Sequence, residues 1–229
     1  TILPILPIYD ELPFTFATIA SILERTPENF GVYLSIKVVI CLVLMFLPTF
    51  FIGMTLPLAS RVVVNRMEVL GKGVGSVFSV NIAGGVVGAV ATGLWLIPTL
   101  ELQDTLILGM FMSLVLGVVV LWVVPTITTR IRTVVPVVCI LLFGLIVGMF
   151  GDWDRKLLNY GLYRQKDFAF DSVEELNSMI APLKLVYVRD GRDSSVAVLE
   201  DERTGNIYLK VNGKTDAGTG QDMATQLWL

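Results

Sequence analysis

Hydrophobic and polar positions divide the chain into two unlike parts. Long apolar windows bounded by charged residues fill the first two thirds, whereas from Asp152 onward charges are mixed and apolar residues alternate with polar ones. A helix that crosses a bilayer needs roughly 20 mostly apolar residues. Four windows meet this requirement and predict transmembrane helices at about 38–60, 73–100, 105–129 and 133–151. We therefore predict a polytopic α-helical membrane bundle over residues 33–151.

Residues 1–32 lack a window of that length. The apolar stretch 12–23 is too short to cross a bilayer, and prolines and acids interrupt the residues before it. We predict an interfacial, extracytoplasmic segment that follows a helix outside the sequence. Because the chain starts at Thr1 and stops at Leu229 within an apolar run, we expect it to be a fragment of a longer protein.

The part from 152 to 229 has the pattern of a small, mainly-β soluble domain. Period-two alternation predicts strands at 184–190, 195–199 and 207–211, joined by turns into a three-stranded antiparallel meander over about 184–212. A short helix is predicted at 173–179, where Asp171 and Ser172 form a cap. We expect residues 215–220 to form a loop and a second helix to start at 221.

Basic residues in short loops indicate the orientation of the bundle, because Lys and Arg are enriched in cytoplasmic loops. The loop after the second span has only the acids Glu101 and Asp104. The loops after the first and third spans are basic and contain Arg61, Arg66, Lys72, Arg130 and Arg132. We therefore predict a bacterial inner-membrane protein whose soluble tail is periplasmic. Basic residues after the fourth span, Arg155, Lys156, Arg164 and Lys166, favour a cytoplasmic tail as the alternative.

Composition excludes several classes of function. The chain is 54% hydrophobic and 16% charged, with a formal charge of −3, so it offers no basic surface for nucleic acid. It has no histidine, which excludes Ser–His triads and His-ligated metal, and we predict no metal site. Cys41 and Cys139 lie in apolar stretches without CxxC spacing, so we expect them to be small buried hydrophobic residues.

The second span is rich in small residues at four-residue spacing. Such spacing lets helix backbones approach closely in lipid, so we predict that these glycines pack helices together. The residues concerned are Gly84, Gly85, Gly88 and Gly93, with Asn81 as a polar contact to a neighbouring helix. A substrate path along this helix, as in a transporter, is the alternative. The four windows contain no charged residue for an ion pathway. The sequence leaves open whether the protein forms a homo-oligomer.

The order of several motifs resembles the membrane-fused members of the spermidine synthase (polyamine aminopropyltransferase) family. In the membrane part these are Leu47-Pro48, Gly53 to Leu58, Asn81-x-x-Gly84-x-x-x-Gly88 and Leu96-Ile97-Pro98. In the tail they are the run from Ile207 to Lys214 and the segment from Gln221 to Leu227. The resemblance covers most of the chain from about Leu47 onward.

The resemblance implies an enzyme that transfers an aminopropyl group from decarboxylated S-adenosylmethionine to an amine. The catalytic core would be a following Rossmann-like domain, which this sequence lacks, so we expect no catalytic residue and no bound cofactor in the fragment itself. By position, Asp222 and Gln226 match substrate-binding residues of the family. Thr225 and Leu227 stand where the family has Tyr and Glu, Asn212 where it has Asp, and Glu101 where it has Gly. The alternative is a transporter-like or scaffold protein with a diverged, non-catalytic synthase-like domain.

Overall fold

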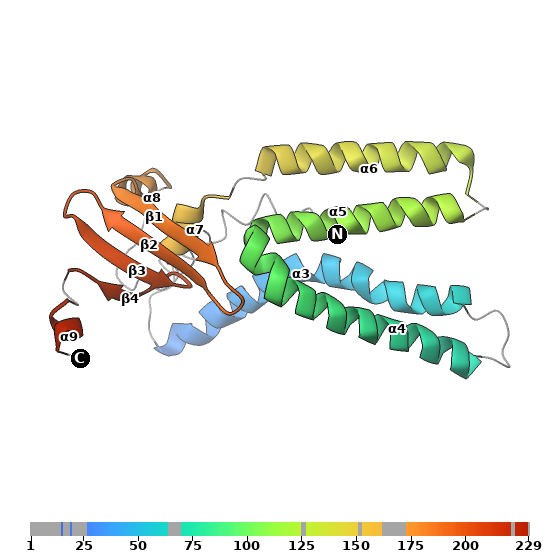
Figure 1. Ribbon diagram of the computed structural model, residues 1–229, viewed down its shortest axis with the longest axis horizontal. Coiled ribbons are helices and arrows are strands. Elements are labelled where there is room, and N and C mark those ends of the chain that lie inside the picture. The colour runs from blue at the N-terminus through green and yellow to red at the C-terminus, as the bar shows by residue number, and fades with distance from the viewer. Residues whose placement is uncertain are drawn as a thin grey trace.

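The computed structural model describes residues 15, 19, 27–63, 70–124, 127–150, 153–161, 173–220 and 223–228. Helices α3 (Pro27–Val63), α4 (Leu70–Ala91), α5 (Ile97–Val123) and α6 (Thr129–Phe150) extend away from a β-sheet that lies at one end of them (Figure 1). Most of the predicted interfacial segment 1–32 lies outside the described residues, and its last residues, 27–32, belong to α3.

Three helices in the described part are long and apolar enough to cross a membrane. They cover Asn29–Val63, Gly71–Val123 and Thr129–Met149. The predicted count of four is not confirmed, because the predicted spans at 73–100 and 105–129 belong to one helical run. A π-helical turn, η3 (Thr92–Leu96), joins α4 to α5 near the point where the run turns back on itself (Figure 1).

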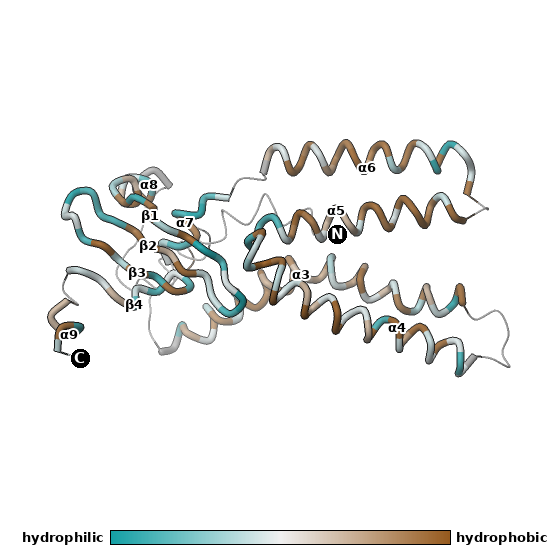
Figure 2. Tube along the Cα trace, viewed as in Figure 1, coloured by the Kyte–Doolittle hydropathy of each residue, from teal (hydrophilic) through white to brown (hydrophobic). Residues whose placement is uncertain are grey.

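The helices are apolar along most of their length (Figure 2), and many of their large apolar side chains are exposed. Val80, Trp122 and Leu141 are 70%, 61% and 67% exposed. Leaving so much apolar surface in water would cost about 25 cal/mol for each Å², so this surface suits lipid. Cys41 is exposed and Cys139 is half-buried, so the expectation that both are buried is wrong for the described chain. Both lie on outward-facing apolar helices rather than in a packed core.

Residues 183–218 form a four-stranded antiparallel sheet in the order β1-β2-β3-β4. The strands are β1 (Leu183–Asp190), β2 (Ser195–Asp201), β3 (Asn206–Val211) and β4 (Lys214–Gly218). The fourth strand lies where we expected a loop, so the three-stranded prediction is wrong by one strand. β4 pairs with β3 because the two-residue turn at Asn212 and Gly213 folds the chain straight back.

The turn between β3 and β4 depends on left-handed backbone conformations. Asn212 and Gly213 have φ angles of 48° and 73°, as a type I′ hairpin turn requires at both central positions. The turn also meets Gly161, which ends helix α7 (Arg155–Tyr160) with a φ of 78°. A Cβ atom built on Gly161 would lie against the carbonyl oxygen of Gly213. Only glycine therefore fits at the end of α7.

A small core fixes α7 and α8 (Val173–Ile180) to the sheet. Asp154 caps α7, because its Oδ1 accepts hydrogen bonds from the backbone N–H groups of Lys156 and Leu157, at 3.0 Å each. Leu176 is 1% exposed and packs with Tyr160 and Ile180 in one buried cluster. Ala197 and Leu199, on β2, are fully buried. The last helix, α9 (Met223–Leu227), follows β4 at the far side of the sheet from the membrane helices (Figure 1).

The contact between Gly161 and the β3–β4 turn gives a testable expectation. Gly161→Ala should lower the free energy of unfolding by at least about 3 kcal/mol, because a steric shift of the turn adds to the left-handed strain. Gly205→Ala is a matched control: Gly205 has a φ of 69°, but no atom lies within 4 Å of its built Cβ. It should cost only about 1–2 kcal/mol. Thermal unfolding in detergent compares the two, and equal losses would contradict the close contact.

Candidate functional site

The sheet is attached to the membrane helices at the turn between α4 and α5. The backbone N–H of Leu102 donates to Asp190 Oδ2 at 3.2 Å. Arg189 Nη2 donates to the carbonyl oxygen of Pro98 at 3.3 Å, and Arg155 forms an ion pair with Glu101. We call this set of contacts the junction. It binds the end of β1 and the start of α7 to one short stretch of the helical run.

Glu101 has an unusual backbone conformation at the junction. Its φ and ψ angles are 66° and 173°, a region that is essentially restricted to glycine and costs about 1–3 kcal/mol for other residues. The helix therefore breaks at Glu101 and starts again at Leu102. The first N–H groups of a helix have no partner within it. Asp190, from another element, supplies an acceptor for one of them, and its negative charge suits the positive end of the helix.

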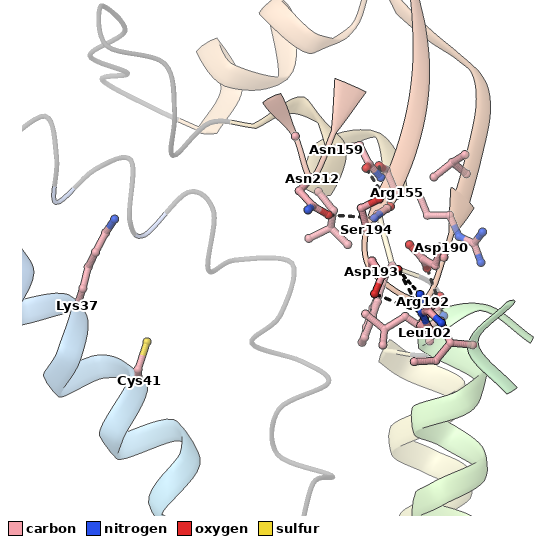
Figure 3. Close-up of a pocket in the computed structure, with 18 residues that line it drawn as sticks. Lys37, Cys41, Leu102, Arg155, Asn159, Asp190, Arg192, Asp193, Ser194 and Asn212 are labelled. Atoms are coloured by element: carbon pink, nitrogen blue, oxygen red, sulfur yellow. Dashed lines mark hydrogen bonds and ion pairs between the residues drawn. The ribbon is translucent and has the colours of Figure 1, made fainter. Parts of the chain in front are cut away.

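A cavity of about 690 Å³ opens beside the junction. Its lining comes from α3, the helical bend, α7, the β1–β2 turn and the β3–β4 turn (Figure 3). The charged side chains in the lining are Lys37, Arg155, Arg192, Asp190 and Asp193. Cys41, Ile97, Leu102, Trp153, Leu158 and Val188 supply apolar surface. A cavity of this size and mixed lining is typical of a small-molecule site.

Many polar groups around the cavity bond to one another. Asn212 Oδ1 accepts from the N–H of Ser195 at 2.9 Å, and the Ser195 hydroxyl lies 3.4 Å from Asn159 Oδ1. Arg192 binds Asp193 through its side chain, and this hydrogen bond raises the pKa of Arg192. The Ser195 hydroxyl therefore has an amide as its partner, not a base. The arrangement is suited to binding rather than to nucleophilic catalysis.

Lys210 is a buried cation on β3, outside the cavity lining. Its side chain is turned toward α7, where Nζ donates to the carbonyl oxygen of Tyr160 at 2.6 Å and lies 4.8 Å from the centre of the Tyr160 ring. The residue is only 5% exposed. Burial disfavours the charged amine and lowers the pKa of Lys210 to about 8. Within the described residues no cluster of acidic or cysteine side chains could hold a metal ion.

Of the two predicted substrate-binding residues, Gln226 does not line the cavity. Gln226 is exposed on α9, and Asp222 lies outside the described residues. The junction residues Glu101, Arg155 and Asp190 were not singled out as site residues. The sequence signals for them are the acids Glu101 and Asp104 shortly after Pro98 and the glycine that the resemblance leads us to expect at position 101. The partners of Glu101 lie far along the chain.

The glycines predicted to pack helices make no such contact within the described part of the chain. A Cβ built on Gly84, Gly85 or Gly88 meets no atom within 4 Å, and Gly93 has only Arg192 Cγ at 3.9 Å. Asn81 is exposed on the same helix. The predicted packing role of these residues therefore stays a prediction, and its partner would lie outside the described contacts.

Replacing Glu101 tests whether its backbone is strained. Glu101→Gly removes both the strain and the ion pair, whereas Glu101→Ala removes the ion pair alone. We expect the glycine variant to be more stable than the alanine variant by about 1–3 kcal/mol. Thermal unfolding of the two variants in the same detergent measures the difference. At an ordinary helical position alanine would instead be the more stable by about 1 kcal/mol, so that order would contradict the strain.

The lowered pKa of Lys210 predicts a pH dependence of stability. On raising the pH, the folded protein releases this proton near pH 8, whereas the unfolded chain keeps it until about 10.5. Between these values the unfolded state binds more protons, so the contribution of Lys210 to the free energy of unfolding increases with pH. We expect the stability difference between the native protein and Lys210→Met to shift in favour of the native protein from pH 7.5 to 9.5. An unchanged difference in urea unfolding would contradict this.

Comparisons with known proteins identify no family for the chain. No family model matches it, and neither a curated protein nor a solved structure matches it. Functional interpretation therefore rests on the residues and geometry described above: a cavity of mixed charge at the junction, an exposed Gln226 on α9 and a glycine-type backbone at Glu101.

Proposed function

We propose that the chain is the membrane anchor and first β-domain of a membrane-fused, spermidine-synthase-like protein. The order of elements supports this proposal. Apolar helices are followed by an antiparallel sheet, and β3 leads through the Asn212-Gly213 turn and β4 to the helix that contains Gln226. We place the protein in a bacterial inner membrane, with the sheet on the periplasmic side.

The observation that carries the proposal is the backbone at position 101. The resemblance to the family leads us to expect glycine there, and the φ and ψ angles of 66° and 173° favour glycine for a physical reason. The glutamate therefore differs from the family in its side chain, while its backbone has the conformation that the family's glycine would adopt.

In this proposal the aminopropyl site forms where α9 and β4 meet a following Rossmann-like domain. The attacking amine forms a C–N bond with the carbon next to the sulfonium of decarboxylated S-adenosylmethionine, and the C–S bond breaks to leave a neutral thioether. The amine proton passes to a carboxylate that acts as a base. Gln226 would orient the amine through its side-chain amide, while the base and the donor site would come from the following domain.

A scaffold or transporter-like protein with a non-catalytic synthase-like domain is the second candidate. The exposed positions around Gln226 favour it, because Leu227, where the family has an acid, is 75% exposed and cannot bind a cationic amine. In that case α9 would serve only as a docking surface. The two candidates differ in whether the complete protein transfers an aminopropyl group.

The test uses the complete protein encoded by the reading frame that contains these residues. Purified in detergent, it should convert a diamine to its aminopropyl product with decarboxylated S-adenosylmethionine, as followed by mass spectrometry. Gln226→Ala should lower kcat/KM about tenfold, the effect expected for one lost hydrogen bond to a charged amine. Glu202→Gln, on the exposed β2–β3 turn, is the control and should leave it unchanged. Absence of transfer by the complete protein would favour the scaffold.

A further inference from the structure

The cavity beside the junction lies at the ends of the membrane helices. Lys37 and Cys41 lie one turn apart on α3, and Trp153 follows the end of α6. Tryptophan is enriched where membrane helices meet the headgroup region. The cavity therefore opens at the level where a lipid head group and the upper part of its acyl chains are found.

The two sides of the cavity differ in chemistry. Cys41 lies on the apolar helix α3, and across from it the β1–β2 turn presents charged side chains, beside Leu102 of the helical bend (Figure 3). A polar metabolite would leave the apolar side unfilled, and a purely apolar molecule would leave charged groups without water. The lining therefore suits an amphiphile.

The charges around the cavity are balanced. The lining contains three cations and two carboxylates, and Glu101 adds a third carboxylate through its ion pair with Arg155. The cations are Lys37, Arg155 and Arg192, and the carboxylates of the lining are Asp190 and Asp193. A simple anion would meet these carboxylates, and a simple cation would meet the arginines. A molecule with both charges suits both groups.

The charged groups around the cavity can still form hydrogen bonds to a ligand, in addition to the bonds they form with one another. A guanidinium has five N–H donors and can bind a phosphate with two of them. Arg155 is bound to Glu101 through one nitrogen, and its side chain is 36% exposed. Asp190 accepts the Leu102 N–H with Oδ2, so Oδ1 can accept from an ammonium group.

We propose that this cavity binds a zwitterionic phospholipid whose head group has a phosphate and a primary amine. Arg155 and Arg192 bind the phosphate, Asp190 and Asp193 bind the ammonium group, and an acyl chain follows α3 past Cys41. This site is separate from α9 and does not depend on the proposed aminopropyl transfer.

Native mass spectrometry of the protein released from nanodiscs tests the proposal. The discs contain equal amounts of phosphatidylethanolamine and the anionic phosphatidylglycerol. The native protein should retain phosphatidylethanolamine in preference. The double variant Arg192→Gln/Asp193→Asn should retain about tenfold less of it, as expected for the loss of a charged hydrogen bond. Equal retention of the two lipids by the native protein would overturn the argument from balanced charge.

A matched double variant controls for the loss of a surface ion pair. Lys214→Gln/Asp216→Asn removes a second exposed ion pair, on β4, whose residues do not line the cavity, and should retain lipid as the native protein does. Both altered pairs are exposed, and thermal unfolding checks that each variant folds. An equal loss of lipid in the two variants would overturn the site. Displacement of the lipid by free phosphoethanolamine at equal concentration would overturn the requirement for an acyl chain.

Discussion

The unpaired N–H groups at the break in the helical run are the constraint on which the rest of the structure depends. A helix that starts again at Leu102 exposes N–H groups without partners inside it, at the end of an apolar bundle. Asp190, at the end of β1, accepts a hydrogen bond from one of these N–H groups. The ion pair between Glu101 and Arg155 attaches α7 at the same point. The position of the sheet, and with it the shape of the cavity, follows from these contacts.

Much of the architecture follows from rules that act locally along the chain. The apolar helices were predicted because lipid leaves few alternatives to a long apolar helix. The first three strands were predicted because alternation has a strict period of two. β4 was missed because its sequence, Lys214 to Gly218, has no alternating apolar residues. The turn at Asn212-Gly213 was the available signal, since this pair strongly favours a hairpin and therefore a partner strand.

Other features depend on contacts between distant residues. Apolar Ile207, Leu209 and Val211 would by alternation place Lys210 in water, yet Lys210 is 5% exposed while Leu209 is 37% exposed. The carbonyl at the end of α7 decides this orientation, and a single sequence does not show that α7 lies there. The backbone path between α4 and α5 was missed for a similar reason, because hydropathy shows where apolar windows stop but not how the backbone runs between them.

The end of β1 also determines what the break at Glu101 can do. Arg189 holds the carbonyl of Pro98, before the break, and its neighbour Asp190 holds the N–H of Leu102, after it. Two successive residues of one strand therefore hydrogen-bond to the backbone on both sides of the break at Glu101. The helix cannot straighten or bend further there without losing one of the two bonds. Any change in the angle between the two arms of the run must consequently move the sheet or release it.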